Sequence, residues 1–144
     1  MKITVEQSPE CREVEVTVKY DVMDGRLGHL IEHIRVYSYS VAGEKDGVTR
    51  NVPLEEIYYF DSVDNKTFIY TKDQMYYCEM KLYELEEQLS DTPFVRISKN
   101  NILNSSMVVK VTALLNGRFE ARLNNNEKVI VTKHYMKLFR TKFE

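Results

Sequence analysis

The sequence predicts a mostly β chain of the α+β class, in which short antiparallel strands follow an N-terminal strand and helix. Three observations indicate this class. From about residue 47 onward, short aromatic and β-branched runs alternate with turn dipeptides. Asn116-Gly117 divides two such runs and is the strongest short hairpin signal in the chain. Helical spacing is confined to a few short stretches.

Residues 1–46 are expected to form an N-terminal strand-helix element that serves self-association or contacts a partner. Residues 12–20 (REVEVTVKY) alternate charged and apolar side chains, as a half-buried strand does. Residues 21–38 then place apolar side chains at helical spacing, which predicts an amphipathic helix with one stripe: Leu27, Leu30, Ile31 and Ile34. The turn-rich segment 42–51 is the expected boundary with a second unit, residues 47–144.

The rest of the chain is expected to consist mainly of short strands. The aromatic and β-branched runs predict strands at 57–60, 67–70, 74–78, 108–115, 118–123 and 128–132. Turns are expected at Asp64-Asn65, Lys72-Asp73, Asn116-Gly117 and Asn124–Asn126. Two helices are predicted in this part, at 81–89 and at 134–143.

Length and composition limit the class of protein. The 144 residues with 43% hydrophobic content can form a core. No apolar run approaches the roughly 20 residues that span a bilayer, and the N-terminus lacks an apolar signal core, so a cytoplasmic location is expected. Cys11 and Cys78 lie far apart without zinc or disulfide spacing and are expected to be free thiols.

The charge distribution is uneven along the chain. The net charge is only -2. Residues 1–93 hold 10 basic and 19 acidic side chains, a net of -9, whereas residues 94–144 hold 10 basic and 3 acidic ones, a net of +7. The last third therefore suits an anionic partner.

Enzymatic signatures are weak. His29-Leu30-Ile31-Glu32-His33 fits the H-x-x-E-H zinc pattern, but catalytic zinc needs a third protein ligand, and the one further histidine is His134 in a basic segment. No glycine-rich phosphate loop, nucleophile motif or paired carboxylates in an apolar setting occur. The sequence therefore predicts no enzyme, no metal and no cofactor.

One polar run stands out between two predicted strands. The stretch FVRISKNNILNSS, residues 94–106, concentrates basic and amide side chains with no acid among them: Arg96, Lys99, Asn100, Asn101 and Asn104. The donors of Arg, Lys and Asn reach phosphates and base edges. Tyrosines and Phe60 in the strands at 57–78 could also stack on bases, although aromatics in β structure more often alternate between core and rim.

Three segments in sequence order resemble the LytTR family of bacterial DNA-binding domains, and the similarity covers residues 47–144 continuously. Its most specific pieces are FVRISK followed by ILN, the NGR hairpin, and Thr132-Lys133-His134-Tyr135, where the family commonly has Ser-Arg-x-Tyr. The resemblance implies a transcription regulator with an elongated β fold that reads DNA with loops. It also implies the stand-alone form, without a receiver domain, often restrained by a small membrane protein.

The resemblance further implies which residues contact DNA, on three loops that enter successive grooves: 64–67, 98–100 and 133–134. The positions that would approach base edges are Lys66, Thr67, Lys99 and His134. The positions that would hold the DNA backbone are Arg96, Asn100, Arg118, Lys133 and Tyr135. Because Lys133 replaces the usual Arg and Asn101 replaces an aromatic or apolar residue, the operator sequence cannot be carried over.

Two functions remain open at this point. The first is a sequence-specific DNA-binding regulator. A homodimer is expected for it, because the apolar stripe of residues 27–34 is too apolar to leave in water and paired half-sites double the recognised length. The alternative is a protein-interaction or scaffold module derived from a DNA-binding domain, which the acidic first part and the Lys substitutions favour.

Overall fold

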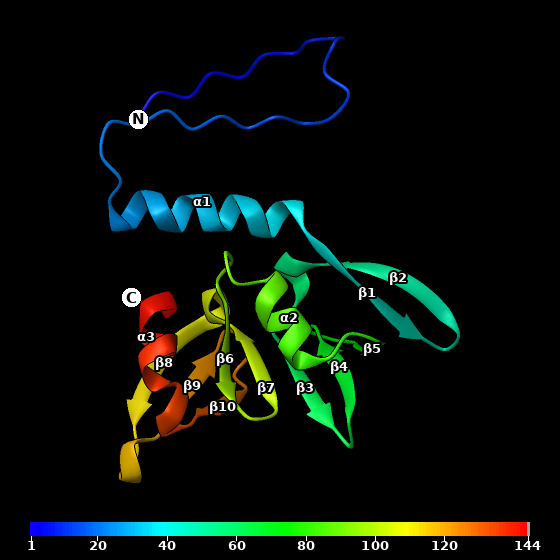
Figure 1. Cartoon of the computed structure of the whole chain (residues 1–144), viewed down its shortest axis with the longest axis vertical. Coiled ribbons are helices and arrows are strands. Elements are labelled where there is room, and N and C mark those ends of the chain that lie inside the picture. The colour runs from blue at the N-terminus through cyan, green and yellow to red at the C-terminus, as the bar shows by residue number, and fades with distance from the viewer. Residues whose placement is uncertain (144) are drawn as a thin grey trace.

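The computed structural model describes residues 1–143, which form two antiparallel sheets with three α-helices (Figure 1). The larger sheet has seven strands in the order β2-β1-β5-β4-β3-β7-β6. Its strands are β1 (Ser40–Lys45), β2 (Val48–Pro53), β3 (Tyr59–Val63), β4 (Lys66–Tyr70), β5 (Met75–Cys78), β6 (Phe94–Ser98) and β7 (Asn101–Asn104). The smaller sheet has the order β10-β9-β8, formed by β8 (Val108–Ala113), β9 (Phe119–Leu123) and β10 (Lys128–Val131).

The helices are short and cover the sheets. They are α1 (Gly25–Ser38), α2 (Leu82–Gln88) and α3 (Met136–Phe143). Four 3₁₀ turns connect elements: η1 (Leu54–Glu56), η2 (Ser105–Met107), η3 (Leu115–Gly117) and η4 (Lys133–Tyr135). No helix within residues 1–143 is long and apolar enough to cross a membrane. The mostly β, α+β class predicted from the sequence is confirmed.

Two hydrophobic cores meet at the end of the large sheet. Successive side chains of a strand point to opposite faces, so Phe94 of β6 joins the core that contains α2, whereas Val95 and Ile97 join the core beneath the small sheet and α3. In β7, Ile102 joins the core that contains α2, and Leu103 joins the core beneath the small sheet. The strands β6 and β7 therefore join the two halves of the molecule.

Buried Asn104 secures this junction. Its side chain is 0% exposed, its Nδ2 donates to the Ile57 carbonyl at 2.9 Å, and its Oδ1 accepts from the Ser106 amide at 3.1 Å. An amide that has partners for both donor and acceptor is tolerated in a core. Asn104 belongs to the polar run that suggested DNA contact, but its role is in the fold.

The N-terminal strand predicted at residues 12–20 is wrong. Residues 1–24 form an extended arm without strand structure, and Val14 and Val16 are 90% and 61% exposed. The predicted helix is confirmed as α1, which begins after Asp24, whose Oδ1 accepts from the Leu27 amide at 2.8 Å. Alternation alone cannot make a strand, since a strand needs a hydrogen-bonding neighbour that this arm lacks within the chain.

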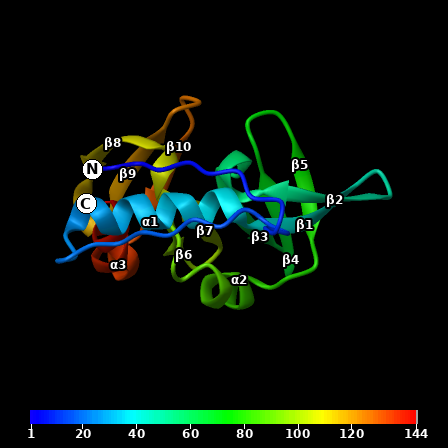
Figure 2. The same ribbon diagram turned by 90° about the horizontal axis from the view of Figure 1, so that it is seen from above.

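Helix α1 lies across the body on the side of η1 and β2 (Figures 1 and 2). Val36 is buried, and two ion pairs bind the helix to the body: Arg35 Nε to Asp91 at 3.5 Å and Lys142 Nζ to Glu32 at 3.9 Å. In the apolar stripe, Leu27, Ile31 and Ile34 are half-buried and Leu30 is 36% exposed. The body therefore covers the stripe only in part.

The segment 42–51, expected to be a turn-rich boundary, is instead a β-hairpin. Strands β1 and β2 pair throughout and turn at Asp46-Gly47, both with positive φ. Glu44 of β1 also pairs with Tyr77 of β5, so this hairpin extends the large sheet. Gly43 allows the approach, because a Cβ there would lie 2.8 Å from the Tyr76 Cβ.

The turn predicted at Asn116-Gly117 is confirmed, with φ of 65° and 72° at the two residues. Replacing Gly117 by Ala should lower the free energy of unfolding by about 1–2 kcal/mol, because a Cβ is disfavoured at this φ. That Cβ would also lie 3.0 Å from the Lys133 Cδ. Urea unfolding of the two proteins measures the difference.

Gly28→Ala is the matched control. Gly28 lies in α1, and a Cβ there would meet nothing within 4 Å. This substitution should stabilise the chain slightly or leave it unchanged, since Ala favours a helix more than Gly does. Equal urea midpoints for the wild type and Gly117→Ala would contradict the assigned turn geometry.

Candidate nucleic-acid interface

Three turns and η4 lie on the side of the molecule opposite α1 (Figure 1). The turns join β3 to β4, β6 to β7, and β8 to β9. We call this surface the loop face and define it as residues 64–66, 99–100, 115–118 and 133–135. The three loops implied by the family resemblance therefore lie on one side of the fold.

Contacts between neighbouring loops hold the loop face together. The Ser62 amide donates to the Asn100 carbonyl at 2.8 Å, which joins the β3 end to the β6–β7 turn. The Thr132 amide donates to the Ile97 carbonyl at 2.9 Å, which joins η4 to β6. The side chain of Lys133 lies against Gly117 in the β8–β9 turn. A surface connected in this way can be rigid before a ligand binds.

The β6–β7 turn is built around Arg96. Its Nε donates to the Ser98 carbonyl at 2.8 Å, one terminal nitrogen donates to the Lys99 carbonyl, and the other forms an ion pair with Glu86 at 3.3 Å. The Arg96 side chain is only 14% exposed. Arg96 therefore positions the turn, and the predicted contact of this guanidinium with the DNA backbone does not fit its placement. Lys99 and Asn100 are exposed at the tip.

Asn101 supports the same turn from below. Its Nδ2 donates to Asp61 Oδ1 at 3.0 Å, and its Oδ1 accepts from the Ser98 hydroxyl at 2.9 Å. Burial raises the pKa of Asp61, and the hydrogen bond from Asn101 acts in the opposite direction. Asn101 thus uses both its donor and its acceptor to fix the turn.

The β3–β4 turn presents one of its two predicted base-contact residues. Lys66 is exposed, but Thr67 is 2% exposed in β4, so the prediction that Thr67 contacts a base is not supported by its burial. Asp64 and Asn65 have φ of 51° and 64°. The Lys81 ammonium donates to the Asn65 carbonyl at 2.7 Å and adds positive charge at this turn, which the sequence did not indicate.

The turn η4 presents Lys133 and His134 to solvent. The edge of one ring of the His134–Tyr135 pair meets the face of the other, with centroids 4.8 Å apart. Tyr135 is half-buried, and its amide donates to the Thr132 carbonyl at 3.0 Å. Tyr135 therefore supports the imidazole. Exposed Arg118 directly follows Gly117, against which the Lys133 side chain lies.

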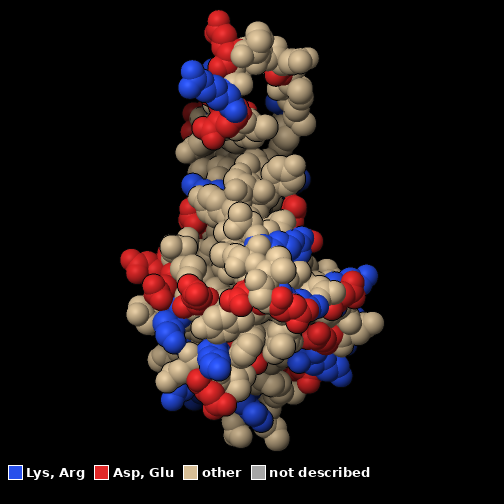
Figure 3. All heavy atoms as spheres, turned by 90° about the vertical axis from the view of Figure 1, so that its right-hand side faces the viewer, with Lys and Arg blue, Asp and Glu red and all other residues tan. Residues whose placement is uncertain are grey.

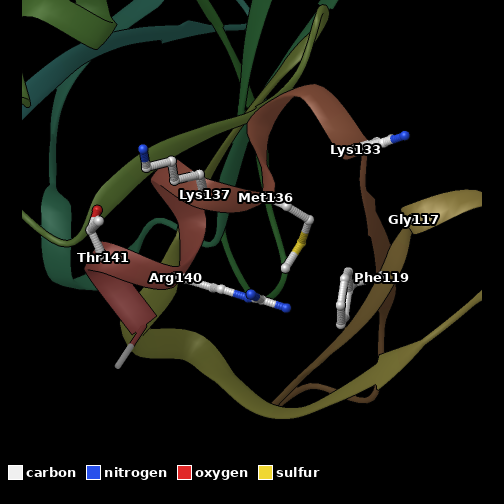
Figure 4. Close-up of a pocket in the computed structure, with 7 residues that line it drawn as sticks. All are labelled: Gly117, Phe119, Lys133, Met136, Lys137, Arg140 and Thr141. Atoms are coloured by element: carbon white, nitrogen blue, oxygen red, sulfur yellow. The ribbon is translucent and has the colours of Figure 1, made fainter.

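A basic hollow of about 630 Å³ adjoins η4 (Figure 4). Its lining includes three cations and no acid: Gly117, Phe119, Lys133, Met136, Lys137, Arg140 and Thr141. Arg140 extends toward Phe119, with its guanidinium carbon 5.4 Å from the ring centroid. Sequence reasoning missed Lys137 and Arg140, although the spacing 133, 137, 140 places cations on one face of a helix.

The chain's histidine motif has no matching metal cluster. Within residues 1–143, no three His, Cys, Asp or Glu side chains lie close enough to hold a metal ion. Nor do any two α-helices in that range follow each other across a short turn, so the described fold has no helix-turn-helix.

Comparison with known families gives a direct result. A family model for the LytTr DNA-binding domain matches residues 47–144. The chain belongs to the LytTR family. An uncharacterized HTH-type transcriptional regulator of Staphylococcus aureus is 26% identical over 100 residues, which are 69% of this chain and 67% of that protein. The sensory transduction protein LytT of Enterococcus faecalis is 27% identical over 88 residues, 61% of this chain and 36% of LytT.

A solved structure confirms the LytTR fold. The LytTr DNA-binding domain of a methyl-accepting/DNA response regulator from Bacillus cereus superimposes with a TM-score of 0.67 at 22% identity. The match covers 72% of this chain and 95% of that domain. In this LytTR chain, the hairpin β1–β2 crosses residue 47, where the family match begins, so the preceding strand is part of the same sheet.

Proposed function

We propose that this LytTR protein is a cytoplasmic transcription regulator that inserts the turns of its loop face into the grooves of duplex DNA. The observation that carries the proposal is that three turns and η4, with exposed basic tips, lie on one side of the fold and contact one another. Donors that are fixed relative to one another can match the fixed spacing of DNA grooves.

The exposed residues fall into two groups by position. Lys66 begins β4 directly after its turn, and Lys99 and His134 lie in two other loops, so these three are proposed to approach base edges. Asn100, Arg118 and Lys133, together with Lys137 and Arg140 of the hollow, flank those tips and are proposed to hold phosphates. Arg96 and Tyr135 position the tips through their contacts with Lys99 and His134.

The regulator is proposed to act as a homodimer on repeated half-sites. Helix α1 exposes Leu30 (36%) and Tyr37 (77%), and the arm ahead of the helix exposes further valines. Helix α1 and the arm lie on the side opposite the loop face, so a partner bound there leaves the DNA side free (Figure 1). The family resemblance also leads us to propose a small membrane protein that restrains the regulator.

Sequencing of the DNA fragments retained by the purified chain tests the proposed function. We expect enrichment of a repeated motif, because base contacts from separate loops select sequence. A variant with Lys99, His134 and Lys66 all replaced by Ala should lose the enrichment. Lys45→Ala, which removes a charge from the β1–β2 hairpin, is the matched control and should retain it. Fragments recovered without sequence bias by the wild type would contradict the proposal.

A further inference from the structure

The N-terminal arm exposes an unpartnered β-like segment. Residues 1–24 extend beyond α1 as a narrow projection from the body (Figures 1 and 3). In this arm, residues 12–20 alternate valines with charged and polar side chains, and Val14 and Val16 are largely exposed. Three valines on one face of an extended segment favour burial against another strand.

We propose that residues 12–20 pair antiparallel with the same residues of a second copy, about a two-fold axis at Val16. This inference deepens the homodimer of the proposed function, and rests on it, by naming the dimer surface. Strand addition satisfies the free backbone groups of both arms, and a two-fold interface uses the same patch on both chains.

The side chains complement each other in this register. Val16 faces Val16, and Val14 faces Val18 on both sides of the axis, so all the valines lie on one face. On the other face Glu13 lies opposite Lys19, which forms two opposite-charge pairs per dimer. Directly opposed side chains of opposite charge stabilise an antiparallel pair, whereas like charges destabilise it.

Neighbouring registers are worse. A shift that centres the pairing on Glu15 places two Glu15 carboxylates opposite each other. A shift in the other direction, centred on Thr17, places Glu15 opposite Lys19, but it also places Glu13 opposite Asp21, and these like-charge pairs offset the gain. A shift of one copy by a single residue places its valines opposite polar residues of the other copy. Such a shift is unfavourable, because the valines of the two copies would then no longer share one face. The register about Val16 alone avoids all three faults.

The chain's own first residues are a poorer partner. The Cys11 amide donates to the Ser8 carbonyl at 3.2 Å and turns the arm back on itself. Continuing that hairpin would match apolar side chains, with Val5 opposite Val14 and Ile3 opposite Val16, but it would place Glu6 opposite Glu13, a like-charge pair. In the described chain no backbone hydrogen bond joins residues 1–8 to residues 12–20. The second copy therefore offers the better charge match.

Charge reversal tests the register by sedimentation equilibrium of the full chain at tens of micromolar. Glu13→Lys alone or Lys19→Glu alone creates two like-charge pairs per dimer and should weaken dimerisation roughly tenfold or more. An equimolar mixture of these two variants should dimerise again, because position 13 of each copy then faces the opposite charge at position 19 of the other. Glu10→Lys makes the same charge change in the turn outside the paired segment and should leave the wild-type constant.

Cross-linking gives a second readout. In a Cys11→Ser background, Val16→Cys should form a disulfide-linked dimer on oxidation, since the two residues at position 16 face each other across the axis. Thr17→Cys faces Glu15 of the other copy and should cross-link far less. Cys78 is buried in the body and stays in place in both variants.

The outcomes separate the dimer surface from the proposed function. A wild-type dimer that is unchanged by both charge variants, with no preference for cysteine at position 16, would overturn the arm pairing and leave the homodimer standing. A wild-type monomer would overturn both. DNA binding by the loop face is measured independently by mobility shift, so neither result bears on groove insertion.

Discussion

Raising the salt concentration from 50 to 200 mM should weaken duplex DNA binding by the full chain by about 10³-fold or more. The expectation follows from the number of exposed cations that the fold gathers on the loop face and the adjoining hollow. Six are available in the structure: Lys66, Lys99, Arg118, Lys133, Lys137 and Arg140. Each phosphate that such a group neutralises releases condensed counterions, and six or more phosphates give a loss of this size.

Mobility-shift titrations at several salt concentrations measure this slope. Replacing Lys137 and Arg140 together by Ala should reduce the slope by about 2, if each neutralises one phosphate. Lys45→Ala removes one charge from the β1–β2 hairpin and should leave the slope unchanged. A flat salt response would reject DNA binding and favour the alternative, a protein-interaction module derived from a DNA-binding domain.

The sequence correctly predicted elements whose conformation depends on the residues of a short segment alone. The Asn116-Gly117 turn needs positive φ at two positions, a property of those two residues, and it was predicted correctly. The strand predicted at residues 12–20 was wrong. Alternation indicates which side chains would share a face of a strand, but not whether a neighbouring strand is present to pair with it. The hairpin at 42–51 was missed because Gly43, Asp46 and Gly47 resemble a loop, whereas pairing with β5 makes this segment part of the sheet.

The sequence likewise predicted only part of the candidate site. Residue type indicated a basic contact surface, but the fold decides which donors are free. Arg96 and Asn104 carry suitable chemistry, yet one is occupied by the Ser98 and Lys99 carbonyls and the other is buried against Ile57. Thr67 is 2% exposed, so its burial does not support the predicted base contact. The sequence does not record such partners, because they come from distant strands.

Lys99→Ala should reduce affinity for the preferred site by about 1–3 kcal/mol and have little effect on random DNA, because a donor that reads a base edge contributes only where that base is present. Lys99 is exposed at the tip of a turn that Arg96 holds in place. His134→Ala should show the same selectivity to a smaller degree, because a neutral imidazole offers a single donor.

Lys133→Ala should behave differently and serves as the contrast. Lys133 lies against Gly117 at the edge of the basic hollow, where phosphate contact is proposed. Its removal should weaken binding to preferred and random DNA alike and reduce the salt slope by about 1. Parallel titrations of the three variants on both kinds of DNA give the comparison. If Lys99→Ala weakened both equally, Lys99 would contact only the backbone, and sequence reading would have to come from Lys66 and His134.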